Sequence, residues 1–429
     1  MEVIRVEGGH PVTGTVTVEG AKNSALKLMA ATILAPGVTT LTNVPNIADV
    51  HVMGKVLKEL GAIVEVVDEH TLSIDTSTVD SWETPYSLVT RMRASTAVLG
   101  PLLARFGKAI VAMPGGCNIG ARSIDMHILG LEALGVEFDV DHGDIYATAP
   151  NGLHGATVNL EFASVGATEN LVMASVHAKG VTIIDNAARE PEIQDLANML
   201  NEMGADIRGA GTPVIEIHGV GELHPVTHAV TGDRIEAGTF AAIGALVGQP
   251  VTIKGFEPDH LGLVLRKFEQ MGITVRRGQR CVTVSRDQPL RAVDIQTLPF
   301  PGFPTDMQAQ TMCLLAVAEG TSIVTENVFE NRFMFASELQ RMGSDIAIQG
   351  HHAVVRGVRS LSGAEVRSPD LRGGAALVMA GLIADGTTTV LDIYHIDRGY
   401  ERFVEKLRSL GAHVTRAEVP DIEVLDDEL

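Results

Sequence analysis

Hydrophobic and polar positions follow the same pattern six times along the chain. In each copy an apolar, helix-like run ends at a glycine and passes into alternating polar and β-branched residues, as in KELGAIVEV and EALGVEFDV. A glycine directly after a periodic apolar run is typical of a helix end, because only glycine adopts the left-handed conformation there at little cost. The pattern predicts six repeats with spacings of 74, 69, 68, 71 and 68 residues between Gly61, Gly135, Gly204, Gly272, Gly343 and Gly411.

A second predicted helix precedes this one in every repeat. It consists of small apolar residues, as in SALKLMAATILA and GAALVMAGLIA, and a helix that is apolar on nearly all sides is buried. It also ends at a glycine, and a β-branched strand follows. These glycines are Gly37, Gly107, Gly180, Gly248, Gly320 and Gly386. Each repeat is therefore predicted to contain a buried helix, a strand, an amphipathic helix and a strand, which makes the fold class α/β.

The repeats divide naturally into two domains of three. A chain of 429 residues is too long for one ordinary core, since domains usually have ~100–200 residues. A polar stretch with Gly and Pro at 224–238 lies near the middle, and the N-terminal VIRVEGGHPVTGTVTVEG predicts two extra strands that could join either domain. A solenoid of interaction repeats is the alternative, although its units usually have ~20–50 residues. Two domains predict a cleft, which is a favoured ligand site.

Charge and cysteine content narrow the class of partner. The 33 Lys and Arg against 53 Asp and Glu give a net charge of −20, which repels nucleic acid and anionic membranes. No apolar run approaches the ~18 residues of a membrane span, and the N-terminus does not resemble a signal peptide. The three cysteines, Cys117, Cys281 and Cys313, are odd in number and far apart, which favours a reducing compartment. We therefore expect a soluble cytoplasmic protein with small-molecule partners.

Two segments that occur in one repeat only carry candidate chemistry. In GAKNSALK, Lys22 and Asn23 lie at a predicted helix entrance, where a lysine adds charge to an anion-binding helix N-terminus; a solvated lysine beside a capping Asn fits equally well. In MPGGCNIGARSIDMH, Cys117 lies in a Gly-rich loop near Arg122, which lowers a thiol pKa and makes the cysteine reactive. The other two cysteines fit buried positions. One Cys and a distant His127 lack metal-ligand spacing, so no metal is expected.

A third segment and a set of arginines add candidate anion contacts. In FPGFPTDMQAQ, residues 300–310, we expect an extended Pro-rich run and then Asp306 at a helix start. Asp306 could be a plain N-cap or a base facing the cleft, and the spacing leaves both open. Arginine suits bidentate grips on phosphate or carboxylate. Those singled out are Arg93, Arg372 and Arg398, each near a predicted helix start, and Arg332.

These segments together resemble one family, the enolpyruvyl transferases of bacterial cell-wall synthesis. The resemblance covers essentially the whole chain and includes RMRAS, PGGCNIGAR, SVGATEN, AAREPEI, DRIEAGTF, FPTDMQAQ, VFENRFM and DLRGG. The related shikimate-pathway branch shares the repeated fold but lacks the Cys loop. The resemblance implies a two-domain inverse α/β barrel of six βαβαββ units. One domain would comprise residues 22–231 and the other residues 1–21 plus 232–429.

The resemblance also implies a reaction, without metal or organic cofactor. The enolpyruvyl group of phosphoenolpyruvate would move to the 3-hydroxyl of UDP-N-acetylglucosamine with release of phosphate, the first committed step of peptidoglycan synthesis. Cys117 would protonate the methylene carbon and would be the target of an epoxide such as fosfomycin. Asp306 would take the hydroxyl proton, and Lys22, Arg122 and Arg398 would hold phosphoenolpyruvate.

Further positions are implied to contact the nucleotide sugar. A lysine that some members carry near Ala48 and another near Phe162 are absent here, so different phosphate contacts of the nucleotide are expected. A catalytically silent UDP-sugar-binding paralogue and a redox sensor at Cys117 are the alternatives from other classes. The implied sugar-nucleotide contacts are Asn23, Arg93, Arg122, Ser123, Ile124, Asp125, Met126, Ser164, Val165, Gly166, Asp306 and Val328, and Arg332 and Arg372 are further candidate substrate-binding residues.

Overall fold

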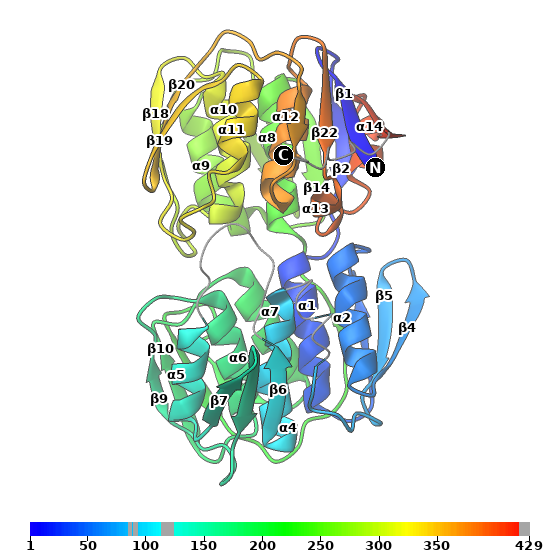
Figure 1. The fold of residues 1–429 in the computed structure, drawn as a ribbon, viewed down its shortest axis with the longest axis vertical. Coiled ribbons are helices and arrows are strands. Elements are labelled where there is room, and N and C mark those ends of the chain that lie inside the picture. Colours follow the sequence, from blue (N-terminus) through cyan, green and yellow to red (C-terminus); the bar gives the residue numbers. More distant parts are fainter. Residues whose placement is uncertain (85–87, 89–92, 113–123, 420–429) are drawn as a thin grey trace, which may run out of the picture.

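The computed structural model describes residues 1–84, 88, 93–112 and 124–419. Figure 1 shows two halves, one above the other, each with helices inside and small sheets outside. The described residues form five four-stranded sheets and one three-stranded sheet. All twelve glycines that the sequence pattern places at helix ends have positive φ, from 67° to 127°. The predicted α/β repeats are therefore confirmed.

The first three repeats make up the lower half of Figure 1. The first contains β13 (Thr227–Ala229), α1 (Lys22–Ala31), β3 (Val38–Thr42), α2 (Ala48–Glu59), β4 (Ile63–Asp68) and β5 (Thr71–Asp75). The second contains the 3-10 segment η2 (Arg93–Val98), α4 (Leu99–Phe106), β6 (Lys108–Ala112), α5 (Asp125–Ala133), β7 (Glu137–Asp141) and β8 (Asp144–Thr148). The third contains β9 (Thr157–Asn159), α6 (Val165–Ser175), β10 (Val181–Asp185), α7 (Pro191–Glu202), β11 (Asp206–Arg208) and β12 (Val214–His218).

The other three repeats make up the upper half. The fourth contains β2 (Gly14–Thr17), α8 (Arg234–Val247), β14 (Val251–Lys254), α9 (Gly262–Gln270), β15 (Thr274–Gly278) and β16 (Cys281–Ser285). The fifth contains β17 (Ile295–Gln296), α10 (Gln308–Ala316), β18 (Thr321–Thr325), α11 (Phe335–Arg341), β19 (Asp345–Gln349) and β20 (His352–Arg356). The sixth contains β21 (Glu365–Arg367), α12 (Leu371–Gly381), β22 (Thr387–Leu391), α13 (Tyr394–Asp397), α14 (Phe403–Ser409), β23 (His413–Glu418) and β1 (Glu2–Glu7).

Three sheets are completed by strands from distant parts of the sequence. β13 pairs in parallel with β3 of the first repeat, although almost two hundred residues separate them. β2 pairs in parallel with β14, and β1 lies antiparallel between β22 and β23. Both N-terminal strands therefore join sheets of the upper half, which answers the question that the sequence pattern left open.

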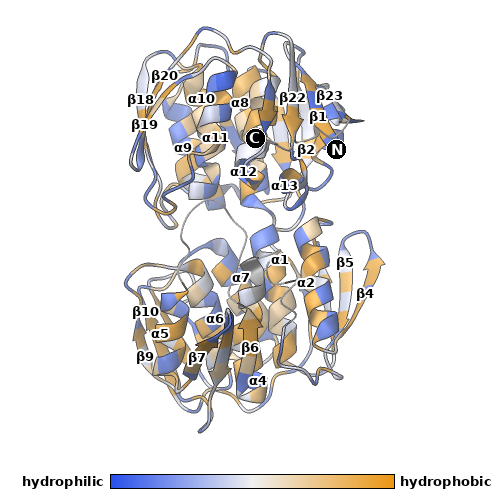
Figure 2. Cartoon of the chain, viewed as in Figure 1, coloured by the Kyte–Doolittle hydropathy of each residue, from blue (hydrophilic) through white to orange (hydrophobic). Residues whose placement is uncertain are grey.

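Two hydrophobic clusters form the interior. One contains buried residues between Ala25 and Val230, and the other contains residues from Ile4 to Val18 together with residues from Ile235 to Val414. Every residue of α10 and α12 except Leu371 is buried, whereas α2 shows hydrophilic as well as hydrophobic positions (Figure 2). We refer to the two halves as the first and second domain, and the boundaries after residues 21 and 231 stay a prediction.

The chain passes between the domains at two adjacent segments. Ala21 N donates to Thr231 O at 2.6 Å, and Asp233 N donates to Glu19 O at 2.8 Å. Between them Gly20 pairs with Gly232. A Cβ on Gly20 would lie 1.9 Å from the carbonyl oxygen of Asn43, so no side chain fits there. This double crossing places the start of α1 directly against the second domain.

None of the helices among the described residues is both long and apolar enough to cross a membrane.

Candidate active site

The first group of candidate residues centres on a carboxylate that sequence reasoning missed. Lys22 lies in the first turn of α1, and its Nζ is 2.7 Å from Oδ2 of Asp49 in the first turn of α2. Arg398 of the second domain reaches the same carboxylate, with 3.0 Å between Nε and Oδ1 of Asp49. Lys22 is 9% exposed and ion-paired, so the alternative of a solvated lysine is wrong.

Burial and charge act together on this group. Burial lowers the pKa of Lys22 below its ordinary value, and the positive charge of Arg398 adds to this effect, while Asp49 only partly offsets it. Burial alone would raise the pKa of Asp49, but the charges of Lys22 and Arg398 outweigh burial and lower this pKa. Asp49 therefore stays ionised and orients both cations.

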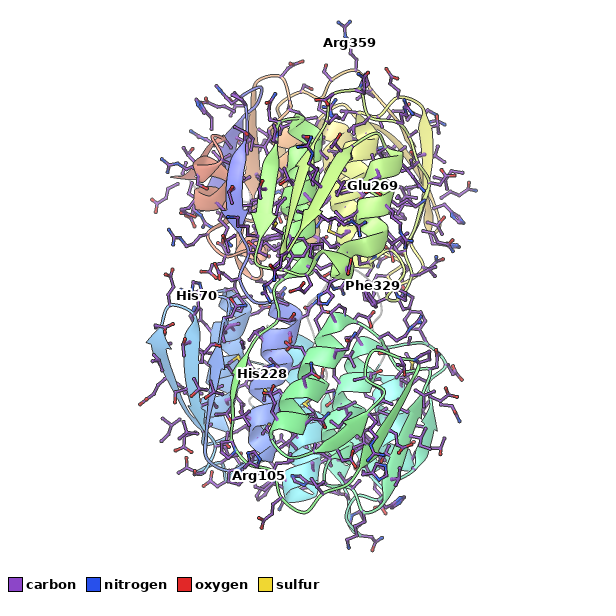
Figure 3. The ribbon with its side chains drawn as sticks, turned by 180° about the vertical axis from the view of Figure 1, so that it is seen from behind. His70, Arg105, His228, Glu269, Phe329 and Arg359 are labelled. Atoms are coloured by element: carbon purple, nitrogen blue, oxygen red, sulfur yellow. The ribbon has the colours of Figure 1, made fainter. Side chains whose placement is uncertain are left out.

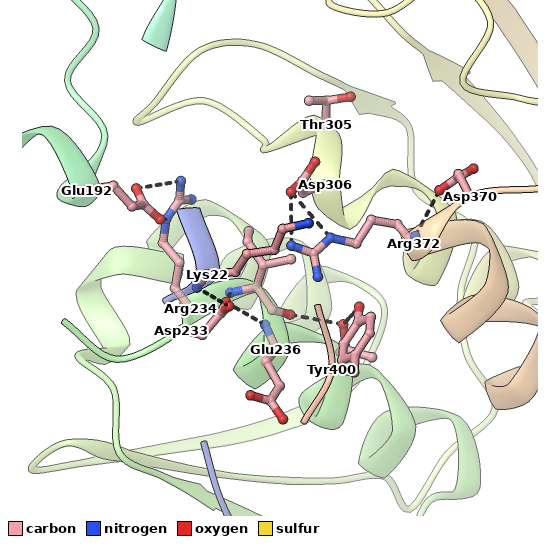
Figure 4. A network of polar contacts seen from close by, with 12 residues as sticks. Lys22, Glu192, Asp233, Arg234, Glu236, Thr305, Asp306, Asp370, Arg372 and Tyr400 are labelled. Atoms are coloured by element: carbon pink, nitrogen blue, oxygen red, sulfur yellow. Dashed lines mark hydrogen bonds and ion pairs between the residues drawn. The ribbon is translucent and has the colours of Figure 1, made fainter. Parts of the chain in front are cut away.

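The second group centres on Asp306. Its Oδ1 is 2.6 Å from Nη2 of Arg332, and its Oδ2 is 3.1 Å from Nη2 of Arg372. Asp306 lies in the 3-10 turn Thr305–Met307, and the N-cap position of α10 belongs to Met307. The carboxylate thus holds two arginines instead of capping the helix. Figure 4 shows Asp306 and Arg372 close to Lys22.

Two neighbouring carboxylates fix the segments that carry these side chains. Asp370 caps α12 by accepting from the backbone nitrogens of Arg372 at 2.8 Å and Gly373 at 3.0 Å. Glu326 accepts from Thr305 Oγ1 at 2.9 Å and from the backbone nitrogen of Val328 at 2.8 Å. The segment that carries Val328 is therefore tied to the turn that carries Asp306.

Further ion pairs join the domains around the site. Arg234 makes a bidentate pair with Glu192, at 3.0 and 3.2 Å, and both side chains are buried (Figure 4). Glu401 accepts from His70 Nε2 and from the backbone nitrogen of Asn46, both at 2.8 Å. Figure 3 shows His70 where the two halves meet. The first turn of α1 is thus surrounded by contacts between the domains.

The Pro-rich run before Asp306 is not extended. Gly302 N donates to Pro299 O at 2.8 Å, and the Phe300–Pro301 peptide is cis, so the run folds into a tight turn. The expectation of an extended segment is therefore wrong. A contact from the other domain also holds this turn in place. The backbone nitrogen of Phe300 donates to Oε1 of Glu190 at 3.1 Å.

Two helix N-termini of the first domain lie close to each other. Ile124 stands at the N-cap position of α5, which begins with Asp125 and Met126. Ser164 caps α6, which begins with Val165 and Gly166, by accepting from Ala167 N at 3.3 Å. A Cβ on Gly166 would lie 3.1 Å from the ring of His127 on α5. Because free backbone N–H groups concentrate at helix N-termini, the pair suits an anionic ligand.

The remaining candidates have mixed outcomes. Asn23 is exposed in the first turn of α1. Arg398 stands at the C-terminal end of α13, not near a helix start as predicted. Arg93 opens η2, and only its backbone is described. The predicted site residues that lie outside the described residues are Cys117, Arg122 and Ser123.

The two other cysteines differ from each other in burial. Cys313 is buried in α10, and burial raises its pKa to about 12, as expected for a structural cysteine. Cys281 is only half-buried at the start of β16, so the expectation of a buried position is wrong for this cysteine. Among the described residues, the two groups of His, Asp and Glu with metal-binding spacing are Glu7, His10 and His413, and Glu69, His70 and Glu401. Neither group includes a predicted site residue.

The fold and the paired cations can now be set beside known proteins. The family model that matches residues 6–407 is described as EPSP synthase (3-phosphoshikimate 1-carboxyvinyltransferase). The chain is a transferase and belongs to this enolpyruvyl transferase family. Within it, the chain belongs to the group whose curated members are named UDP-N-acetylglucosamine 1-carboxyvinyltransferase.

Two relatives carry this assignment, and two solved structures share the fold. The relative from Trichlorobacter lovleyi is 50% identical over 98% of this chain and all of its own length. The relative from Carboxydothermus hydrogenoformans, which carries the number 2 in its name, is 54% identical over 97% of this chain and 99% of its own length. The enolpyruvyl transferase NikO from Streptomyces tendae has a TM-score of 0.89 at 29% identity over 98% and 99% of the two chains. EPSP synthase from Acinetobacter baumannii shares the fold, with a TM-score of 0.75 and 19% sequence identity over 97% of this chain and 100% of its own. The predicted inverse α/β barrel and the predicted branch of the family are confirmed.

Proposed function

We propose that the chain transfers the enolpyruvyl group of phosphoenolpyruvate to the 3-hydroxyl of UDP-N-acetylglucosamine and releases phosphate, in the cytoplasm, as the first committed step of peptidoglycan synthesis. The observation that carries this proposal is the pair of cation clusters at the domain contact. Lys22 and Arg398 share Asp49, while Arg332 and Arg372 share Asp306. In a protein with a net charge of −20, four gathered cations indicate an anionic substrate.

Phosphoenolpyruvate matches the first cluster in charge. It carries a phosphate and a carboxylate, and a guanidinium and an ammonium bind such groups through charge-assisted hydrogen bonds. Lys22 and Arg398 come from different domains, so an anion between them is held by both. Arg122 would add a third cation from the segment that carries Cys117. Asp49 orients Lys22 and Arg398 through its ion pairs with both.

The reaction requires an acid at carbon and a base at oxygen. Cys117 would give its proton to the methylene carbon, which leaves an oxocarbenium-like centre at the carbon that bears the phosphate oxygen. The 3-hydroxyl then adds to this centre and loses its proton to Asp306. When phosphate departs, the new methyl group returns a proton to the Cys117 thiolate, and the enol ether forms. Holding both substrates in register supplies the entropic part of the acceleration.

Asp306 can act as the base although two arginines hold it. Arg332 and Arg372 favour the ionised carboxylate, which makes it a weak base. A hydroxyl becomes strongly acidic while its oxygen bonds to a cationic carbon, so a weak base suffices at that step. The same arginines fix the carboxylate in one orientation.

The two helix N-termini would receive the nucleotide. Residues 124–126 and 164–166 present backbone N–H groups to a diphosphate, and Ser123 and Arg93 would add contacts. Asn23 and Val328 would border the sugar. Because Ala48 and Phe162 stand where some family members have lysine, backbone groups carry more of the diphosphate binding here.

The decisive experiment follows phosphate release from purified protein with both substrates, one substrate, or neither. We expect release only with both substrates, and its near-complete loss in Cys117→Ser. Cys281→Ser is the matched control, since this half-buried cysteine on β16 lies outside the proposed site, and it should keep normal turnover. Folded wild-type protein that binds UDP-N-acetylglucosamine without releasing phosphate would instead indicate a silent paralogue.

A further inference from the structure

A cluster of two histidines and one glutamate lies where the first and last strands of the chain meet. Glu7 ends β1 and pairs directly with His413, the first residue of β23. His10 follows Glu7 by three residues, in the loop that leaves β1. The backbone therefore fixes the origin of all three side chains.

The three side chains already converge. Nδ1 of His413 is 3.4 Å from Oε2 of Glu7, and Nε2 of His10 is 3.9 Å from the same oxygen. The two imidazole rings stack with their centroids 3.5 Å apart. The three donor atoms all lie within 4.8 Å of one another. Two ligands at tetrahedral Zn²⁺, with bonds of about 2.0–2.1 Å, stand roughly 3.3 Å apart, so rotation of half-exposed or exposed side chains closes the difference.

We propose that Glu7, His10 and His413 bind a Zn²⁺ ion, with water at the fourth position. Two imidazoles and one carboxylate are a ligand set that suits zinc, whereas Mg²⁺ and Ca²⁺ need several oxygen ligands. Arg5 and Arg408 line the groove that contains Glu7 and His413. Their charges weaken the binding of any cation here, so an ion at this place has to be held by coordination to nitrogen.

The proposed site is remote from the candidate active site. The backbone nitrogen of Gly9 donates to Leu382 O just beyond the end of α12, whereas Arg372 stands at the start of that helix. The 11 residues of α12 span roughly 16 Å at 1.5 Å per residue. Zinc here would not meet the substrates.

The effect of zinc at this place would be structural. β1 closes the sheet of the sixth repeat between β22 and β23, and an ion that bridges Glu7 and His413 ties the first strand to the last. Because the three ligands come together only when β1 is in place, zinc binds the folded state alone and raises its stability.

The test measures zinc affinity and thermal stability of the full chain after chelator treatment. Affinity is measured by competition with a chromophoric zinc chelator, using zinc chloride in a non-coordinating buffer. We expect His10→Ala and His413→Ala each to weaken the tightest zinc site roughly tenfold or more. We also expect the rise in Tm on zinc addition to disappear in both variants.

A matched control is His218→Ala. Nε2 of His218 lies 2.6 Å from Oε1 of Glu216, and the side chains are 37% and 43% exposed, so this pair resembles His10 and Glu7 but has no second imidazole. The His218→Ala variant should bind zinc like the wild type. Tm values without zinc report whether the variants fold, since the side chains of His10 and His413 are 37% and 55% exposed. Unchanged zinc affinity and Tm shift in His10→Ala and His413→Ala, or equal losses in His218→Ala, would overturn the proposal.

Discussion

The carboxylate of Asp49 in the first domain accepts a hydrogen bond from Arg398 of the second domain, with 3.0 Å between Oδ1 and Nε. The same carboxylate pairs with Lys22 at 2.7 Å. The side chains of Asp49, Lys22 and Arg398 are 4%, 11% and 18% exposed. One buried anion therefore links the contact between the domains to the cations proposed to hold phosphoenolpyruvate.

Replacing this anion should destabilise the protein. Asp49→Asn leaves Lys22 and Arg398 buried without a counter-charge, and we expect the free energy of unfolding to fall by about 3 kcal/mol. Denaturant unfolding measures the change. Asp345→Asn is the control, because its pair with Arg356 at 3.1 Å is about half exposed and should contribute less than about 1 kcal/mol. Equal effects of the two substitutions would contradict the importance of burial.

Neutralising the proposed base should reduce turnover far more than binding. Asp306→Asn keeps the shape of the side chain and removes its charge, so we expect kcat to fall roughly 100-fold or more. Steady-state phosphate release gives kcat, and calorimetry gives the affinity for UDP-N-acetylglucosamine, which should change little. A kcat within about fivefold of the wild type, from variant protein that remains folded at the assay temperature, would exclude Asp306 as the base.

Glu169 should make stability depend on pH near neutrality. It lies on α6 with Oε2 at 2.6 Å from Nζ of Lys27, and burial raises its pKa from 4.5 to about 7. Between pH 4.5 and about 7, the folded state therefore holds a proton on Glu169 that the unfolded state has lost. The resulting stability is present in full below about pH 4.5 and is lost as pH rises through about 7.

Glu169→Gln should flatten this dependence. The difference between the two pKa values corresponds to at most about 3 kcal/mol. Denaturant unfolding from pH 5 to 8 should give a shallower decline for Glu169→Gln than for the wild type. The control is Glu137→Gln on β7, where the side chain is exposed and the slope should stay unchanged. Parallel curves for wild type and Glu169→Gln would rule out the raised pKa.

His228 bridges two carboxylates behind α1. Its Nε2 is 2.9 Å from Asp195 and its Nδ1 is 2.8 Å from Glu202. Burial alone would lower the pKa of His228, but the hydrogen bonds to Asp195 and Glu202 outweigh burial and raise this pKa above 6.5. The imidazolium thus contributes stability that is present in full below pH 6.5 and is lost as pH rises through the raised value.

The fall in the free energy of unfolding caused by His228→Gln should therefore be larger at pH 6 than at pH 9. We expect a cost of about 2–3 kcal/mol at the lower pH, because the buried carboxylate of Asp195 loses its charged donor. Unfolding at both pH values checks this expectation. His224→Gln changes an exposed neighbouring histidine and should have no such effect. A cost for His228→Gln that does not depend on pH would show that the imidazole is neutral in the folded state.

The double crossing should not tolerate a side chain. Gly20→Ala places a Cβ 1.9 Å from Asn43 O and 2.9 Å from Val230, and the backbone atoms around it cannot move without breaking the pairing with Gly232. We expect Tm to fall by roughly 10 °C, equivalent to several kcal/mol. Gly221→Ala has open space around the new Cβ and should change Tm by less than about 2 °C.

Local patterns predicted the repeats well, for physical reasons. A helix end needs a residue with positive φ, and Gly61 and Gly107 show how this need marks the sequence itself. The entrance of α1 at Lys22 followed from its neighbours in the same way. The tight turn at Phe300, in contrast, is fixed partly by Glu190 of the other domain, and no local pattern carries that information.

The partners of the site residues were also beyond the sequence. Asp49 is an acid in the first turn of a helix, which is a common position, so nothing marked it as the anion between Lys22 and Arg398. The pairing of β13 with β3 and of β1 with β23 likewise depends on how distant repeats close upon each other. The motifs that carry the family resemblance identified Asp306, but not the two arginines as its holders.

The double crossing has a consequence for limited proteolysis. Because the polypeptide leaves and re-enters the second domain through two hydrogen-bonded segments side by side, a nick in one segment leaves the other intact. Fragments from a single cut would therefore migrate together under native conditions and separate only in denaturant. Physical separation of the two domains requires both connecting segments to be cut, so the domains are joined by two independent covalent links.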